Sequence, residues 1–150
     1  MVTVETYIKH RNCFIKIEPD TDIEFITDVC YLEGAIVIKY YTQEIMGLKQ
    51  YDLINHLWSY VIDAIDELIE GKRETSFWFP DQPLNVILRN EKNNRNGLLI
   101  IIGKKTYMVE KKEFFLEILS AADVFWELLA QCDVSVLERK NKIQEIRKKL

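Results

Sequence analysis

The order of elements along the chain predicts an α+β fold: a mostly antiparallel sheet, one central amphipathic helix and a C-terminal helical pair packed against it. Three observations support this class. The first 46 residues lack helical periodicity, helical spacing of apolar residues begins near residue 49, and the last third is helical again after a second set of strands. No repeat, low-complexity tract or linker divides the 150 residues, so we expect a single domain over residues 1–150.

Three strands are expected in the first region. The stretch "CFIKIEPD", residues 13–20, alternates apolar and polar side chains and predicts a half-buried strand that ends at the proline. Residues 23–34 and 35–46 predict two antiparallel strands joined by a tight turn at Glu33-Gly34. The second of these is apolar on both faces for part of its length, so we expect it in the middle of the sheet.

The chain from Lys49 to Gly71 predicts the most regular helix. Its apolar residues recur at the i, i+3, i+4, i+7 spacing of an amphipathic helix. They are Ile54, Leu57, Trp58, Val61, Ile62, Ile65, Leu68 and Ile69. Gly71 stands where a left-handed residue would end the helix, and Lys72 and Arg73 place positive charge beside the last carbonyl groups.

Four further strands are expected in the middle of the chain. They are "TSFWF" at residues 75–79, "LNVILRN" at 84–90, "LLIIIG" at 98–103 and "KTYMVE" at 105–110. The polar loop "EKNNRNG" ends in Asn96-Gly97, which indicates a hairpin because both residues tolerate positive φ. A second turn is expected at Gly103-Lys104.

The last third predicts two helices. The first has an apolar stripe made of Phe115, Ile118, Leu119, Ala122, Phe125, Trp126 and Leu129. Asp133 and Ser135 begin the second helix, and Ser135 with Glu138 matches a capping box.

The second of these helices ends in a basic tail. Residues 139–149 contain six basic side chains against one acid. Such a tail could contact RNA or an acidic protein. Ile143, Ile146 and Leu150 at helical spacing favour the other interpretation, a helix that rests on the domain with its basic side in water.

Charge is unevenly distributed along the chain. The net charge is −4, with 10 basic against 16 acidic residues in residues 1–103 and 10 against 8 in residues 104–150. Nucleic-acid binding requires a basic face that neutralises phosphates, so the acidic excess argues against that function for the first two-thirds. The same excess suits a basic protein partner.

Cysteine usage and the lack of long apolar segments predict a cytoplasmic protein. Cys13, Cys30 and Cys132 are irregularly spaced and odd in number, unlike a secreted disulfide framework, so we interpret them as small apolar residues. The N-terminus has no apolar stretch of signal-peptide length. The longest aliphatic run, residues 98–102, is far shorter than the ~20 residues of a membrane helix.

The usual catalytic signatures are missing. The five glycines form no phosphate-binding loop, HExxH, CxxC and G-x-S-x-G do not occur, and there are only two histidines. We therefore expect no catalytic residue, no cofactor and no metal. His10 and Cys13 could form a thiolate pair, but a loop histidine before a strand with an inward cysteine is favoured, because no nearby group would orient the imidazole. His56 is interpreted as a flanking residue of the helical stripe.

Four carboxylates share one face of the predicted central helix: Asp63, Asp66, Glu67 and Glu70. A solvated face is the default interpretation, and a di-metal site would need a Glu-x-x-His step that the chain lacks. However, these acids lie in the last two turns, where the helix dipole is negative, and they repel one another. This arrangement suits a surface that binds a cationic partner, so all four are candidate partner-binding residues.

The segment "FWFPDQPL", residues 77–84, contains two of the three prolines. The prolines remove backbone donors and disfavour helix in the preceding residues, so a structural corner between two strands is the favoured interpretation. The alternative is a rigid exposed loop that presents Trp78, Asp81 and Gln82 to a partner at a low entropic cost. These three are further candidate partner-binding residues.

Several stretches together give a resemblance to a known group of proteins. They are "YLEGAIVIKYYTQEIMG", "DLINHLWSYVIDAIDELIEG" leading to "FPDQP", and "KKEFFLEILSAADVFWELL". The chain resembles, over residues 23–132, the small soluble bacterial immunity proteins encoded beside polymorphic or contact-dependent toxins. The resemblance implies a non-enzymatic protein that binds a cognate toxin and blocks its active site, and it brings no motif residues with it.

Two functions are therefore kept open. The first is a protein-binding module, an immunity protein that neutralises a basic toxin through an acidic surface. The second is a small-ligand-binding protein or an enzyme, with a pocket between the sheet and the helices lined by Trp58, Trp78 and Trp126.

Overall fold

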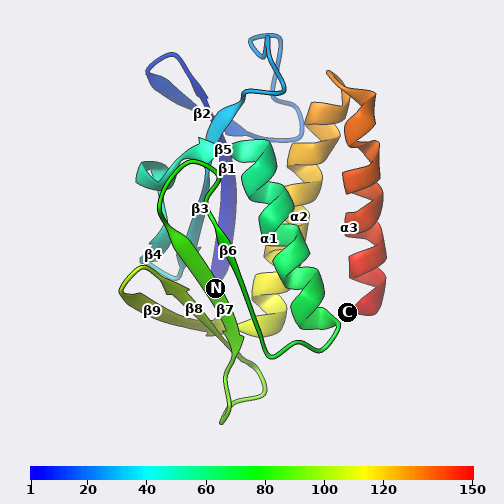
Figure 1. Cartoon of the computed structure of the whole chain (residues 1–150). Helices are drawn as coiled ribbons and strands as arrows, with labels where there is room; N and C mark the ends of the chain where they lie inside the picture. Colours follow the sequence, from blue (N-terminus) through cyan, green and yellow to red (C-terminus); the bar gives the residue numbers. More distant parts are fainter.

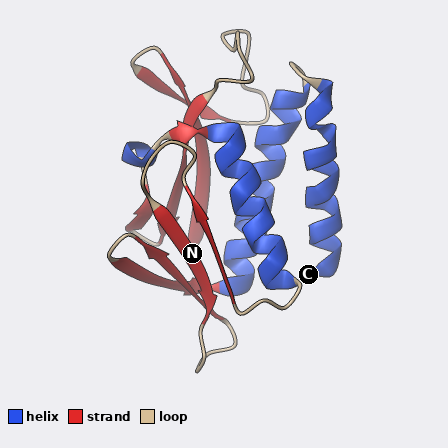
Figure 2. Cartoon of the chain, viewed as in Figure 1, coloured by secondary structure: helices blue, strands red, loops and turns tan.

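Strands occupy one side of the molecule and helices the other. The structure is a computed structural model and describes residues 1–150. Figure 1 shows two antiparallel sheets beside three helices, and Figure 2 shows the same division by type of element. The predicted α+β class is confirmed, with two sheets in place of one continuous sheet.

The first sheet is built from the N-terminal part of the chain. Its strands are β1 (Val2–His10), β2 (Cys13–Ile17), β3 (Glu33–Tyr40) and β4 (Gln43–Met46), in the order β2-β1-β3-β4, and the short β5 (Asp52–Leu53) also pairs with β3. The prediction that the apolar stretch around Val37 lies in the middle of a sheet is confirmed, because β3 has β1 on one side and β4 with β5 on the other.

The second sheet is a meander of the four strands expected in the middle of the chain. They are β6 (Glu74–Trp78), β7 (Asn85–Asn90), β8 (Gly97–Ile102) and β9 (Lys105–Glu110), in the order β6-β7-β8-β9. Each strand is antiparallel to the next, and β6 and β9 form the two edges.

Three helices cover these sheets: α1 (Ile54–Ile69), α2 (Lys111–Ala130) and α3 (Leu137–Lys149). Two 3-10 turns, η1 (Leu48–Gln50) and η2 (Val134–Val136), precede α1 and α3. No helix combines the length and the apolar character that crossing a membrane requires.

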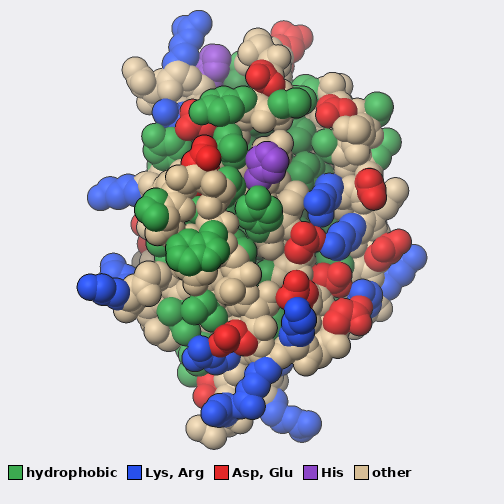
Figure 3. All heavy atoms as spheres, in the orientation of Figure 1, with side chains coloured by type: hydrophobic (Ala, Val, Ile, Leu, Met, Phe, Trp, Pro, Cys, Tyr) green, Lys and Arg blue, Asp and Glu red, His purple; other side chains and the backbone are tan.

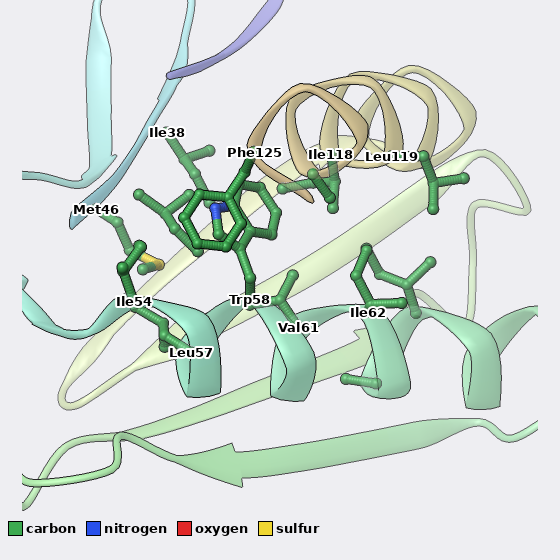
Figure 4. Packing of buried hydrophobic residues seen from close by; sticks show 14 of the residues in the cluster. Ile38, Met46, Ile54, Leu57, Trp58, Val61, Ile62, Ile118, Leu119 and Phe125 are labelled. Atoms are coloured by element: carbon green, nitrogen blue, oxygen red, sulfur yellow. The ribbon is translucent and has the colours of Figure 1, made fainter. Parts of the chain in front are cut away.

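The apolar stripe of α1 forms the centre of the core. Leu57 and Trp58 are fully buried, and Figure 4 shows Trp58 against Phe125 of α2, with Ile38 and Met46 of the first sheet nearby. Burying one such large side chain stabilises the fold by about 2–3 kcal/mol. Because the core also includes side chains from the second sheet and from α3, the two sheets and the three helices share one core cluster of 35 residues.

The predicted C-terminus of α1 is confirmed in detail. Gly71 has φ +114°, in the left-handed region. The amide of Gly71 donates to the carbonyl of Leu68 (3.2 Å), and the amide of Lys72 donates to that of Glu67 (3.1 Å). This is the Schellman pattern of backbone bonds that closes a helix and reverses the chain into β6.

The turn predicted at Glu33-Gly34 is wrong. Gly34 lies inside β3, where β1 approaches so closely that a Cβ would stand 2.3 Å from the carbonyl oxygen of Tyr7. Glycine is therefore needed for backbone approach rather than for a turn. Residues 23–32 contain no strand, and the chain reverses after β3 at Tyr41, which has φ +56°.

The β7–β8 hairpin and helix α3 both form as predicted, but the local geometry expected at the hairpin turn and at the start of the helix is wrong. The β7–β8 hairpin forms, but neither Asn96 nor Gly97 has positive φ, and its loop ends in a turn that the bond from the amide of Gly97 to the carbonyl of Asn94 closes (3.0 Å). The capping box at Ser135 does not form. Asp133 instead accepts the amide of Ser135 (3.0 Å) at the start of η2, and α3 begins after Val136 without a side-chain cap.

Candidate protein-binding surface

The four acids on one face of α1 all meet basic side chains of the same chain. Three of them face α3, whose cations reach across the interface between the two helices. The ion pairs are Asp63 with Arg139 (3.4 Å) and Lys142, Asp66 with Lys149 (3.1 Å), and Glu70 with Lys149. Glu67 pairs with Lys72, just beyond the end of the helix, at 3.0 Å. This face is therefore neutralised within the chain, and its predicted role in partner binding stays a prediction.

The ion pairs shift proton affinities in the expected directions. Hydrogen bonds from Lys72, and then from Thr75, lower the pKa of Glu67. Hydrogen bonds to Glu70, and then to Asp66, raise the pKa of Lys149. Both shifts favour the charged forms, so the pairs persist across the neutral pH range.

The basic tail takes the form that the sequence favoured. Ile143 and Ile146 are buried against the domain, whereas Leu150 is 40% exposed. The basic side chains of α3 are not simply solvated, because most of them pair with acids of α1 and α2. A cleft of about 560 Å³ is lined by seven residues of α3 and by Asp66 of α1, and six of these eight residues are charged.

The segment after β6 is a structural corner fixed by a buried carboxylate, Asp52. This side chain is 4% exposed and accepts the backbone amides of Leu53 (2.7 Å), Asp81 (3.0 Å) and Gln82 (3.1 Å). The side-chain amide of Gln82 donates to the carbonyl of Tyr51. The favoured interpretation of a corner is confirmed, and Gln82 is committed to holding it.

Trp78 and Tyr60 form an exposed aromatic surface beside this corner. Trp78 is 61% exposed and Tyr60 of α1 is 38% exposed. Together with Phe77, Phe79 and Pro80 they line a shallow hollow of about 410 Å³. Figure 3 shows hydrophobic side chains gathered on this face, next to the alternating acids and bases that cover the lower part of α1 and α3. Large exposed aromatic groups are enriched at protein interfaces.

The hollow borders the open edge of β6. The amide of Phe79 bonds to the carbonyl of Leu84, and the amide of Asn90 bonds to that of Arg73, both at 2.9 Å. In this register Thr75 and Phe77 face β7, so the backbone groups of Glu74, Ser76 and Trp78 point away from it. No further strand pairs there, and no other hydrogen bond engages the outward backbone groups of Ser76 or Trp78.

Unpaired acids gather at the N-terminal end of α1. Residues 17–38 contain six acids and no lysine or arginine, and only Glu18 among these acids has an ion-pair partner. The loop between β2 and β3, which holds most of these acids, is bonded to the first turn of α1. The side-chain amide of Asn55 donates to the carbonyl of Val29 in this loop (3.2 Å). Asp81 lies at the same end of α1, is exposed, and has no ion-pair partner.

The three tryptophans do not line one pocket. Trp58 is fully buried and its Nε1 donates to Oγ1 of Thr6 at 3.2 Å, and Trp126 is 3% exposed. Trp78 lies outside the core on an edge strand. The pocket expected for the small-ligand hypothesis is therefore not formed by these residues, because two of them fill the core.

His10 and Cys13 do not form the arrangement that either interpretation expected. His10 is the last residue of β1 and its ring lies 5.1 Å from that of Phe25, while Cys13 is its cross-strand neighbour in β2. Cys13, Cys30 and Cys132 are all exposed, so the inward position expected for Cys13 is wrong and none of the three is a buried apolar residue. No group of three or more His, Cys, Asp or Glu side chains is arranged to hold a metal ion.

Sequence reasoning missed two residues of this surface, Asp52 and Tyr60. An aspartate two residues before a helix suggests a cap for that helix, whereas Asp52 caps the distant corner. Tyr60 lies off the apolar stripe of α1, so the helical pattern does not single it out. A large aromatic residue on the polar side of an amphipathic helix was the signal that could have found it.

Comparisons with protein-family models, with curated proteins and with solved structures found no match. The resemblance to immunity proteins therefore stays a prediction.

Proposed function

We propose that the chain is a non-enzymatic protein-binding module that docks a basic partner on the surface around Trp78. The observation that carries the proposal is the 61% exposure of Trp78 beside Tyr60, in a hollow whose last residue, Pro80, is followed by the unpaired Asp81. An aromatic anchor surrounded by complementary charge is the usual composition of an interface hot spot.

The partner expected from the resemblance is a toxin domain, and the chain is then its immunity protein. The acidic loop between β2 and β3, together with Asp81, supports a basic partner better than the acids of α1 do. The reason is that a cationic partner would have to compete with α3 for Asp63 and its neighbours.

The test is co-expression with a toxic protein encoded next to this chain, followed by affinity purification of the complex. We expect the wild-type chain to restore growth and to co-purify with the toxin. Trp78→Ala should weaken the complex by a factor of about 30 or more, as for an interface hot spot. Met108→Ala is the matched control, because Met108 is also exposed (48%) and lies on the opposite edge strand of the same sheet.

A chain that neither protects nor co-purifies with the toxin would contradict the immunity function. Equal binding by the Trp78→Ala and wild-type chains would show that the partner docks elsewhere.

A further inference from the structure

The edge strand β6, five residues long and with Thr75 bonded to Glu67 of α1, carries none of the residues that usually blunt such an edge. Natural edge strands are commonly blunted by lysine, by proline, by shortness or by a covering element. The other edges of the two sheets follow this rule: β2 carries Lys16, β9 begins with Lys105, and β4 has only four residues. The five residues of β6 contain neither lysine, arginine nor proline.

The open side of β6 offers a continuous set of unpaired groups. Glu74, Ser76 and Trp78 are all exposed, and their backbone amides and carbonyls point away from β7. An extended peptide that lay along this edge would satisfy these groups by ordinary sheet hydrogen bonds. Strand pairing would then extend the second sheet by one strand.

The hollow and Asp81 would make this edge selective for peptides with an apolar and a basic side chain at suitable positions. A side chain of the added strand near Trp78 would enter the space between Trp78 and Tyr60, which is apolar. Asp81 follows three residues later, exposed and without a cation, and its backbone is fixed by Asp52. A basic side chain of the added strand suits this position because it would pair with a carboxylate on a rigid backbone.

We propose that the open edge of β6 accepts an extended segment of the partner as a fifth strand, with an apolar side chain in the Trp78–Tyr60 hollow and a basic side chain beside Asp81. This proposal rests on the proposed function and specifies how the docking occurs. A rigid corner favours this mode, because little conformational entropy of the receptor is lost on binding.

The proposal is tested with displayed random nine-residue peptides selected on the full chain. We expect the selected peptides to alternate apolar and polar residues and to contain a basic residue at a constant offset from the apolar anchor. In the complex with a selected peptide, the amides of Ser76 and Trp78 should exchange with solvent at least about tenfold more slowly, because they become hydrogen-bonded. The amide of Met108 should be unchanged.

Ser76→Pro is the decisive variant. It removes one outward amide at an edge position, where proline is tolerated, and should weaken peptide binding about tenfold. Ser76→Ala keeps the amide and is the matched control, with unchanged binding expected. Asp81→Asn should weaken binding about threefold and reduce its dependence on salt.

Several results would overturn strand addition. They are the selection of no peptide, binding without slower exchange at Ser76 and Trp78, or equal binding by a folded Ser76→Pro chain and the wild type. If Ser76→Pro fails to fold, the exchange measurement on the wild-type chain decides alone. Capture of the toxin by the whole chain is a separate result, so the proposed function can survive the loss of this mode of docking.

Discussion

The two ends of α1 both gather acids, but only one end is neutralised. At the C-terminal end, Asp63, Asp66 and Glu70 pair with cations of α3. At the N-terminal end, Asp81 and most acids of the β2–β3 loop have no cationic partner. The position of α3 accounts for the difference, because its cations reach the acids at the C-terminal end of α1.

This difference shows that a row of acidic residues in a sequence does not by itself predict a negative electrostatic potential at the protein surface. The acids of α1 form the most regular charge pattern in the chain, yet a helix 70 or more residues later supplies the counter-charges of three of the four. The less regular acids of the loop and the corner remain available to a partner. The following predictions change one end of α1 at a time.

The largest effect is expected at the N-terminal end, from Asp52→Ala. The substitution removes a buried acceptor and leaves the amides of Asp81 and Gln82 without a partner. We expect a loss of about 3 kcal/mol in the free energy of unfolding, because orphaned buried groups and charged hydrogen bonds are costly. Urea unfolding measures it. Asp52→Asn keeps the shape and should lose less, and a loss below about 1 kcal/mol for the alanine variant would contradict the role of this carboxylate.

At the C-terminal end, Ile143→Ala should have the next largest effect. Ile143 is fully buried and, with Ile146, anchors α3 to the domain. A cavity at this site should cost about 2 kcal/mol of unfolding free energy. Leu137→Ala in the same helix is the matched control, because Leu137 is 46% exposed and should change stability little. Equal losses for the two variants would show that the apolar contacts do not hold α3.

The ion pairs between α1 and α3 should contribute less than the apolar anchor. Asp63→Asn removes the carboxylate that pairs with Arg139 and Lys142. We expect a loss of about 0.5 kcal/mol at low salt that disappears in high salt, because the groups are partly exposed. Glu117→Gln removes the same charge from an unpaired position on α2 and serves as the control. A loss independent of salt would contradict an electrostatic origin.

The smallest expected effect is a change in the pKa of Glu67 when Lys72 is replaced. Its pKa is lowered in the folded chain, chiefly by the hydrogen bond from Lys72 and then by that from Thr75. Its contribution to stability is therefore complete above the unfolded pKa and is lost as the pH falls through the lower pKa of the folded chain. Carboxyl chemical shifts followed by NMR measure this. Lys72→Met should raise the pKa toward its ordinary value, and an unchanged titration would contradict the assigned cause.

Local signals in the sequence predicted the elements whose determinants are also local. The stripe of α1 with its glycine stop and the four strands of the second sheet are such cases. Gly34 shows where local reasoning fails, because its role depends on the close approach of the neighbouring strand β1, which lies far away in the sequence. The strand β1 itself was not predicted separately from the β-rich region around it.

The candidate site was only partly predictable for the same reason. Trp78, Asp81 and Gln82 could be singled out because the prolines mark a rigid segment, and the structure leaves the first two exposed. The pairing of the α1 acids with α3, and of Asp52 with the corner, joins residues about 30 to 80 positions apart. No periodic pattern encodes such contacts, so they become visible only in the folded chain.

The exposed thiols have a practical consequence for measurement. Cys13 lies where β2 begins, Cys30 lies in the β2–β3 loop, and Cys132 follows α2, so all three stand at one end of the molecule, away from the β7–β8 hairpin (Figure 1). Maleimide dyes would label that end without substitution of any core residue. The same thiols would cross-link neighbouring molecules on oxidation, so a reductant should keep purified samples uniform.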